Sequence, residues 1–165
     1  MGLSDIAEGI EVTTEQRDPG VARSDRTDAS LTERLMPFAE ELPCSAEEAA
    51  LVVEAYAEGA SLGRSAAVAE LPKTTAAKTL YLLGEPIDPL TPTARRVLED
   101  WLAGSISRTE AKTLANVGEA AFALGVYVVT HDPIPAAETA VADALALEDA
   151  PDPLSDARSG VDDWL

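Results

Sequence analysis

Apolar residues recur along this chain at intervals of three and four with polar residues between them, the pattern of amphipathic helices. The clearest case is the stretch from Ala57 to Gly84, AEGASLGRSAAVAELPKTTAAKTLYLLG. Its first half predicts a short helix over 62–69 with Ser61 as the N-cap, since serine is a favoured capping residue. Its residues at helical spacing share one face and allow close packing: Leu62, Ser65, Ala66 and Ala69.

The second half of the stretch predicts a helix from Pro72 to Leu83, because the first helical position tolerates a proline, which has no N–H. Glu70 and Leu71 form the turn between the two helices, and Leu71 packs back beneath it. The helical period expects Ala76, Leu80 and Leu83 to be buried, and it expects an outward face made of Lys73, Thr74, Ala77, Lys78 and Tyr81.

Three capping boxes mark further helix starts, because in each a serine is followed three positions later by a glutamate. They are Ser30 with Glu33, Ser45 with Glu48 and Ser107 with Glu110. Pro37 should kink or end the helix that starts after Ser30, whose inner residues are Leu31, Leu35 and Phe38. Gly59 should end the helix that starts after Ser45, whose apolar stripe is Leu51, Val52, Ala55 and Tyr56. The other expected helices are Pro92 to Ala103 after the cap Thr91, with Val97, Leu98, Trp101 and Leu102 inside, Glu119 to Val129, and Pro135 to Leu147.

Two parts of the chain resemble each other. YAEGASLGRSAA (56–67) and WLAGSISRTEA (101–111) share an aromatic residue, a glycine, a small residue, a leucine or isoleucine, and an arginine. After small adjustments of length, residues 92–130 suggest a second three-helix unit with the plan of the first. The further correspondences are Leu71 with Val117, Pro72 with Gly118, Ala76 with Phe122, Leu80 with Val126, and Tyr81 with Tyr127.

The segment SLGRSAAVAELPKTTAAKTLYLL (61–83) resembles the helix-turn-helix of recombinases, sigma factors and homeodomain-like regulators, on the residues Leu62, Ala66, Leu71, Thr75-Ala76 and Leu80. Two positions depart from that pattern: Glu70 stands where glycine is usual, and Pro72 where serine or threonine is common. The resemblance implies that the helix from Pro72 reads DNA. Lys73, Thr74 and Lys78 would then face bases, with Arg64 and Thr75 on phosphates. The alternative is an alanine-rich helical hairpin inside a bundle.

These elements predict an all-α fold, a small helical bundle with a helix-turn-helix trihelical unit that the internal similarity would duplicate. The expected organisation is an N-terminal arm or short β-hairpin over 1–28, a helical unit over 29–84, a second helical unit over 85–148 and an acidic disordered tail over 149–165.

The formal charge of −18, from 30 acidic and 12 basic residues, makes the composition resemble cytosolic proteins of salt-loving archaea. In those proteins a negative surface maintains solubility. Such a charge opposes nucleic-acid binding, although in molar salt the screening length falls to about 3 Å. Residues 61–84 form the one net-positive window, with three bases and one acid.

The chain lacks the residues for common catalytic and metal sites. The single Cys44 and single His131 exclude an intrachain disulfide, a zinc site and a Ser/His/Asp triad, and His131 is expected to cap a helix. There is no glycine-rich phosphate loop, so we expect no enzyme, cofactor or metal. With no signal peptide and no run of 18 apolar residues, we expect a cytoplasmic protein without a membrane partner.

The leading interpretation is therefore a helix-turn-helix protein that binds double-stranded DNA in transcriptional regulation, as a homodimer through the apolar second helical unit. The alternative is a non-enzymatic protein–protein interaction module. The whole composition also resembles small haloarchaeal families without an assigned activity, and that resemblance is compatible with either function.

Overall fold

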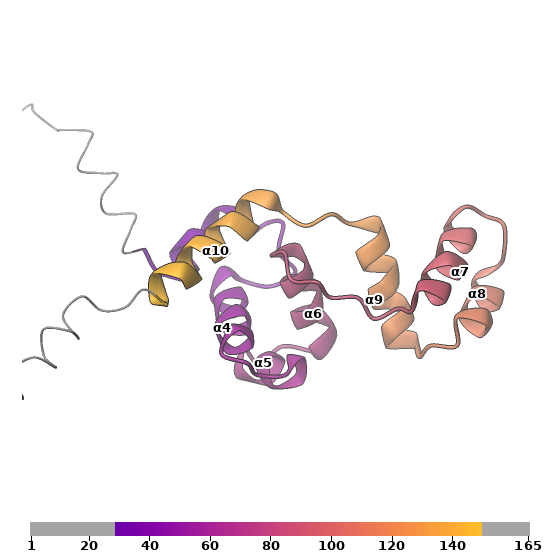
Figure 1. Ribbon diagram of the computed structural model, residues 1–165, viewed down its shortest axis with the longest axis horizontal. Helices are drawn as coiled ribbons and strands as arrows, with labels where there is room; N and C mark the ends of the chain where they lie inside the picture. The colour runs from indigo at the N-terminus through magenta and orange to yellow at the C-terminus, as the bar shows by residue number, and fades with distance from the viewer. Residues whose placement is uncertain (1–28, 150–165) are drawn as a thin grey trace, which may run out of the picture.

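The computed structural model describes residues 29–149, and this range is all-helical, with eight α-helices and no strand (Figure 1). The expected N-terminal arm or hairpin (1–28) and nearly all of the expected acidic tail lie outside the described residues. The helices are α3 (Leu31–Leu35), α4 (Ala46–Ala57), α5 (Leu62–Val68), α6 (Lys73–Leu82), α7 (Pro92–Leu102), α8 (Arg108–Ala115), α9 (Glu119–Thr130) and α10 (Pro135–Glu148), and the 3-10 turn η2 (Met36–Phe38) follows α3.

Side-chain caps set the starts of five helices at the residues that the sequence predicted. At Ser30, Ser45 and Ser107 the hydroxyl accepts the N–H of the glutamate three positions on, and the glutamate side chain accepts the serine N–H in return. Ser61 and Thr91 cap α5 and α7 in the same way but without a returning glutamate. These caps satisfy N–H groups that the first turn of a helix leaves without partners.

Prolines decide two helix boundaries. The α-helical geometry of α3 ends at Leu35, and Pro37 lies in the 3-10 turn, as expected. Pro72 is not the first helical residue, which corrects the prediction by one position. It has extended backbone angles (φ −58°, ψ 141°) and acts as the N-cap, so α6 begins at Lys73.

The first helical group consists of α3, α4, α5, α6 and α10 around one apolar core. Leu35, Val52 and Leu80 are fully buried at its centre. Leu51 is exposed, so its predicted place in the inner stripe of α4 is wrong, and Val53 is buried instead. The other buried members are Leu31, Leu42, Ala46, Ala49, Ala50, Ala66, Ala69, Ala76, Leu82, Leu83, Ala137, Val141 and Ala144.

The second helical group consists of α7, α8 and the outer side of α9 around a smaller core. Leu98 and Phe122 are fully buried there, and Trp101 lies against Phe122 with 5.6 Å between ring centroids. Leu102, predicted as an inner residue of α7, is exposed. Figure 1 shows α9 between the two groups, and the side chain of Tyr127 on this helix packs against the first core.

The same succession of caps and turns occurs in α4–α6 and in α7–α9. The N-caps Ser45 and Thr91 are 46 positions apart, and so are Ser61 and Ser107, and Pro72 and Gly118. Glu70 and Asn116, also 46 apart, are the two residues other than glycine with positive φ within 29–149, at +55° and +50°. The turn before the third helix is therefore left-handed in both.

This left-handed turn explains why glycine is usual where Glu70 stands, and it yields a prediction. The Glu70 side chain is exposed and has no hydrogen-bond or ion-pair partner within the described part of the chain. We expect Glu70→Gly to raise the free energy of unfolding by about 0.5–1 kcal/mol, because a non-glycine residue in this conformation costs about 1–2 kcal/mol and glycine loses part of that gain in the unfolded chain. Denaturant titration measures the change. The matched control Asn116→Gly should gain less, since asparagine tolerates positive φ, and a Glu70→Gly protein less stable than the parent would contradict the account.

Candidate functional site

The third helices of the two similar successions, α6 in α4–α6 and α9 in α7–α9, contact each other near their C-terminal ends. The Tyr81 hydroxyl donates towards the carbonyl oxygens of Val128 and His131, at 3.0 and 2.6 Å. The Lys78 ammonium lies 4.8 Å from the ring centroid of Tyr127, a cation–π distance. His131 stacks on the same ring, and its Nδ1 lies 3.1 Å from the Tyr127 carbonyl oxygen, so this histidine caps α9 as predicted.

Burial favours the protonated form of both phenols at this contact. Burial raises the pKa of Tyr81, with Asp132 adding to the effect. Burial also raises the pKa of Tyr127, and Tyr81 contributes. Because both hydroxyls stay protonated at neutral pH, Tyr81 remains a donor for the carbonyl groups at the end of α9.

Residues from the N-terminal halves of α6 and α9 line a cleft of about 400 Å³. Its walls are mainly apolar, with Lys73 and Thr74 exposed at the edge. The lining residues are Leu62 from α5, Lys73, Thr74 and Ala77 from α6, Pro89 from the connector between α6 and α7 (residues 83–91), and Ala120, Ala121 and Leu124 from α9. A concave apolar surface with few polar groups is the usual form of a binding site.

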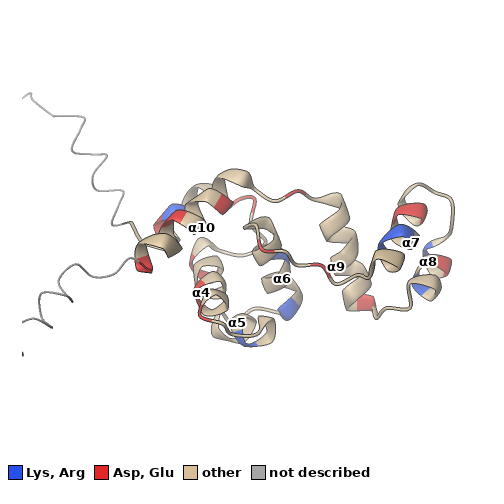
Figure 2. Ribbon diagram, viewed as in Figure 1, with Lys and Arg blue, Asp and Glu red and all other residues tan. Residues whose placement is uncertain are grey.

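Lys73 at the cleft and Arg64 on α5 lack acidic partners within 29–149, unlike the bases Arg108 and Lys112 of the second group. Lys73 and Arg64 are exposed and form no ion pair with any residue in 29–149. Figure 2 shows basic segments on α5 and α6, and basic and acidic segments together on α7 and α8. In the second group Arg108 and Lys112 both pair with Glu119, which stands 46 positions after Lys73. The first group therefore presents unneutralised positive charge where the second group is neutralised internally.

The five residues expected to contact DNA do not share one open surface. Arg64, Lys73 and Thr74 are exposed, whereas Thr75 is partly buried and Lys78 is partly buried against the Tyr127 ring. The expectation that Ala77 and Tyr81 point outward is wrong, because Ala77 is 1% exposed and Tyr81 is bonded to the end of α9. The predicted outward face of α6 is thus largely the face turned towards α9.

The sequence did not identify the far wall of the cleft. Ala120, Ala121 and Leu124 come from a helix that the sequence assigned to packing or dimerisation. A signal was present in the two adjacent alanines at the start of an apolar helix, since small residues leave space against a neighbour. Gly125 lets the backbone of α9 approach Leu90 of the connector closely, because a Cβ at this position would clash with Leu90 Cδ1.

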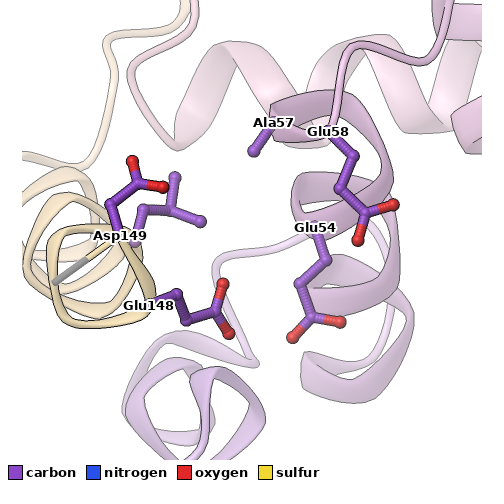
Figure 3. A pocket seen from close by; sticks show the side chains of 6 residues that line it. Glu54, Ala57, Glu58, Glu148 and Asp149 are labelled. Carbon is purple, nitrogen blue, oxygen red and sulfur yellow. The ribbon is translucent and has the colours of Figure 1, made fainter. Parts of the chain in front are cut away.

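A second pocket has acidic walls. Glu54 on α4 and Glu58 at its C-cap lie across from Glu148 and Asp149 at the end of α10, with Ala57 and Leu145 completing the lining (Figure 3). Burial raises the pKa of Glu54, and the charges of Glu148 and Glu58 raise it further. No group of three or more histidine, cysteine or acidic residues suited to a metal ion was found within 29–149. The four carboxylates of this pocket therefore repel one another.

Within the same range, no single helix has both the length and the apolar character needed to cross a membrane. Only the pair α8 and α9, taken together, meets the criteria of length and composition, and it bends by 107°.

Within residues 29–149, fold and site together describe an all-helical arrangement in which α6 of the first group meets α9, and the two helices line an apolar cleft with a basic edge. A family model matches residues 1–163, and the chain belongs to that family, which is described as a family of unknown function (DUF7858). No curated protein and no solved structure matches the chain.

The Tyr81 contact yields a prediction about the junction of the two groups. We expect Tyr81→Phe to lower the free energy of unfolding by about 1–2 kcal/mol, because the carbonyl groups at the end of α9 lose their donor. Chemical denaturation measures the loss. Tyr56→Phe is the matched control, since the Tyr56 hydroxyl has no hydrogen-bond partner among the described residues and its removal should change little. Equal effects of the two changes would refute the role of the Tyr81 hydroxyl.

The raised pKa of Glu54 predicts how the stability of the protein changes with pH. Because the folded-state pKa of Glu54 is raised, ionisation of this carboxyl opposes folding, so its contribution to stability falls as pH rises through the folded pKa. We therefore expect Glu54→Gln to stabilise the protein at neutral pH and low salt, with a gain that shrinks in molar KCl and at acidic pH. Thermal unfolding across pH and salt tests this. Glu47→Gln in the first turn of α4 should show no such gain, and a salt-independent effect at Glu54 would count against charge repulsion.

Proposed function

We propose that the protein is a non-enzymatic protein–protein interaction module that binds a segment of a partner in the α6–α9 cleft. The observation that carries this proposal is the apolar cleft itself, at the open end of two helices that are held together at their other end. The face of α6 available to a ligand lines the cleft between α6 and α9, and a peptide side chain fits such a cleft better than a DNA duplex does.

The cleft selects for a particular partner chemistry. Its alanine and leucine walls favour one apolar anchor side chain. Lys73 at the edge, which has no ion-pair partner within 29–149, and the positive end of the α6 dipole favour acidic residues next to that anchor. The proposed ligand is therefore an acidic segment that carries one large apolar residue.

DNA binding in transcriptional regulation is the second candidate. It is supported by the net-positive window over 61–84 and by the exposure of Arg64, Lys73 and Thr74 around the start of α6. For Thr75 and Lys78 to join them on a duplex, Lys78 would have to leave the Tyr127 ring and α9 would have to move away from α6. This rearrangement makes DNA the less favoured ligand.

A labelled synthetic peptide containing Glu-Glu-Phe-Leu tests the interaction proposal by fluorescence anisotropy. We expect it to bind the parent protein, and we expect Ala120→Phe, which fills the cleft from an exposed position, to weaken binding at least about tenfold, or about 1.4 kcal/mol. Lys73→Glu should weaken it as well. The matched controls are Ala123→Phe, exposed on the same helix outside the cleft, and Arg96→Glu, and both should leave binding unchanged.

The same measurement with a labelled DNA duplex discriminates the two candidates. The interaction proposal expects no duplex binding that depends on the two lysines of α6. Duplex binding that is lost in Lys73→Ala/Lys78→Ala, with a salt dependence of at least one phosphate equivalent, would favour DNA reading. Peptide binding that is unchanged in Ala120→Phe and Lys73→Glu would remove the cleft as the binding site.

A further inference from the structure

We infer that residues 161–165 of this same chain (VDDWL) dock in the α6–α9 cleft and compete there with the partner segment. The inference rests on the proposed function, because it uses the same cleft and the same ligand chemistry. It makes the tail a built-in competitor, so that a partner binds only by displacing it.

The first argument is the chemistry of the segment. Trp164 and Leu165 supply large apolar side chains, and Asp162 and Asp163 place two carboxylates directly before them. This is the combination that the apolar walls and the basic edge of the cleft favour. Residues 1–28, the other part of the chain outside the described range, contain no aromatic residue.

The second argument is charge complementarity. Residues 150–165 carry four aspartates and one arginine. Lys73, which lines the cleft, has no acidic partner within 29–149, in a chain whose formal charge is −18. The carboxylates of the second pocket lie at the end of α10 where the tail begins, and they repel an acidic segment from that site.

The third argument is reach. The start of the tail lies near the cleft, because Asp149 lines the acidic pocket together with Glu58. Glu58 is four residues before the cleft residue Leu62, and four residues span at most about 14 Å. From Asp149 to Trp164 the chain has 15 residues, which span up to about 50 Å when extended. The tail is therefore long enough to reach the cleft of its own molecule without any change in the helices.

Docking within one molecule makes a weak contact effective. A short tethered segment has an effective concentration of about 1 mM, so a segment whose free affinity is about 100 µM would occupy the cleft about ten times out of eleven. A free partner of similar affinity would then bind about tenfold more weakly than to an unoccupied cleft.

Tryptophan fluorescence tests the contact in the full chain. The chain has two tryptophans, and Trp101→Phe leaves Trp164 as the only reporter while it keeps an aromatic ring against Phe122. We expect Trp164 emission to be shifted to the blue and protected from acrylamide, at every protein concentration. Adding Ala120→Phe or Lys73→Glu should expose Trp164, whereas Ala123→Phe should not.

Competition provides a readout that does not depend on the Trp101 change. In the otherwise unchanged chain, Trp164→Ala/Leu165→Ala should increase the affinity for the Glu-Glu-Phe-Leu peptide about tenfold. The control Leu154→Ala, which is also in the tail but outside residues 161–165, should not change this affinity.

The outcomes separate the two proposals. If the peptide binds the cleft but Trp164 is as exposed as a free peptide and the double variant binds no better, the tail contact is wrong and the proposed function stands. If the peptide binds neither the parent nor the double variant and Trp164 is exposed, both proposals fail. Burial of Trp164 that appears only at high protein concentration would overturn docking within one molecule and indicate a second copy.

Discussion

The contact between the C-terminal ends of α6 and α9 is the interaction on which the rest of the arrangement depends. The Tyr81 hydroxyl bonds the carbonyl groups at the end of α9, and Lys78 covers Tyr127. The N–H of Ile134 donates to the Leu82 carbonyl at 2.8 Å, so the chain leaving α9 is fixed to the end of α6 before α10 returns to α3. Because this end is closed and the other is not, the two helices enclose a cleft.

The two groups differ in whether their basic residues pair with acidic ones. Their caps and turns recur at the same interval, but Glu119 in the second group neutralises Arg108 and Lys112, whereas Lys73 in the first group has no acidic partner within the described range. In a chain with so few bases, this leaves the cleft edge as a local exception to a negative surface. An acidic ligand meets least repulsion there, and the proposals for a partner and for the tail both depend on that difference.

Much of the fold was predictable because it follows from local chemistry. Serine or threonine caps and glycine or proline stops define helix ends through hydrogen bonds and backbone angles that involve only neighbouring residues. The cleft was not predictable in this way. Helical periodicity correctly placed Lys73, Thr74 and Tyr81 on a common side of α6, yet it does not show whether water or another helix covers that side. Ala77 was assigned outward and is buried, because the neighbour on that side comes from a separate part of the chain.

The sequence alone determined the helical character of the described residues 29–149, the helix starts at Ser30, Ser45, Ser61, Thr91 and Ser107, and the presence of only one histidine and one cysteine. Only the tertiary structure decided that α9 lies against α6, that Lys78 lies over Tyr127, and that Ala120 and Ala121 face Thr74 across a cleft. The physical reason is that caps and periodicity act over a few residues. Contact between α6 and α9 depends instead on how two cores, joined by the connector before α7, orient these two helices.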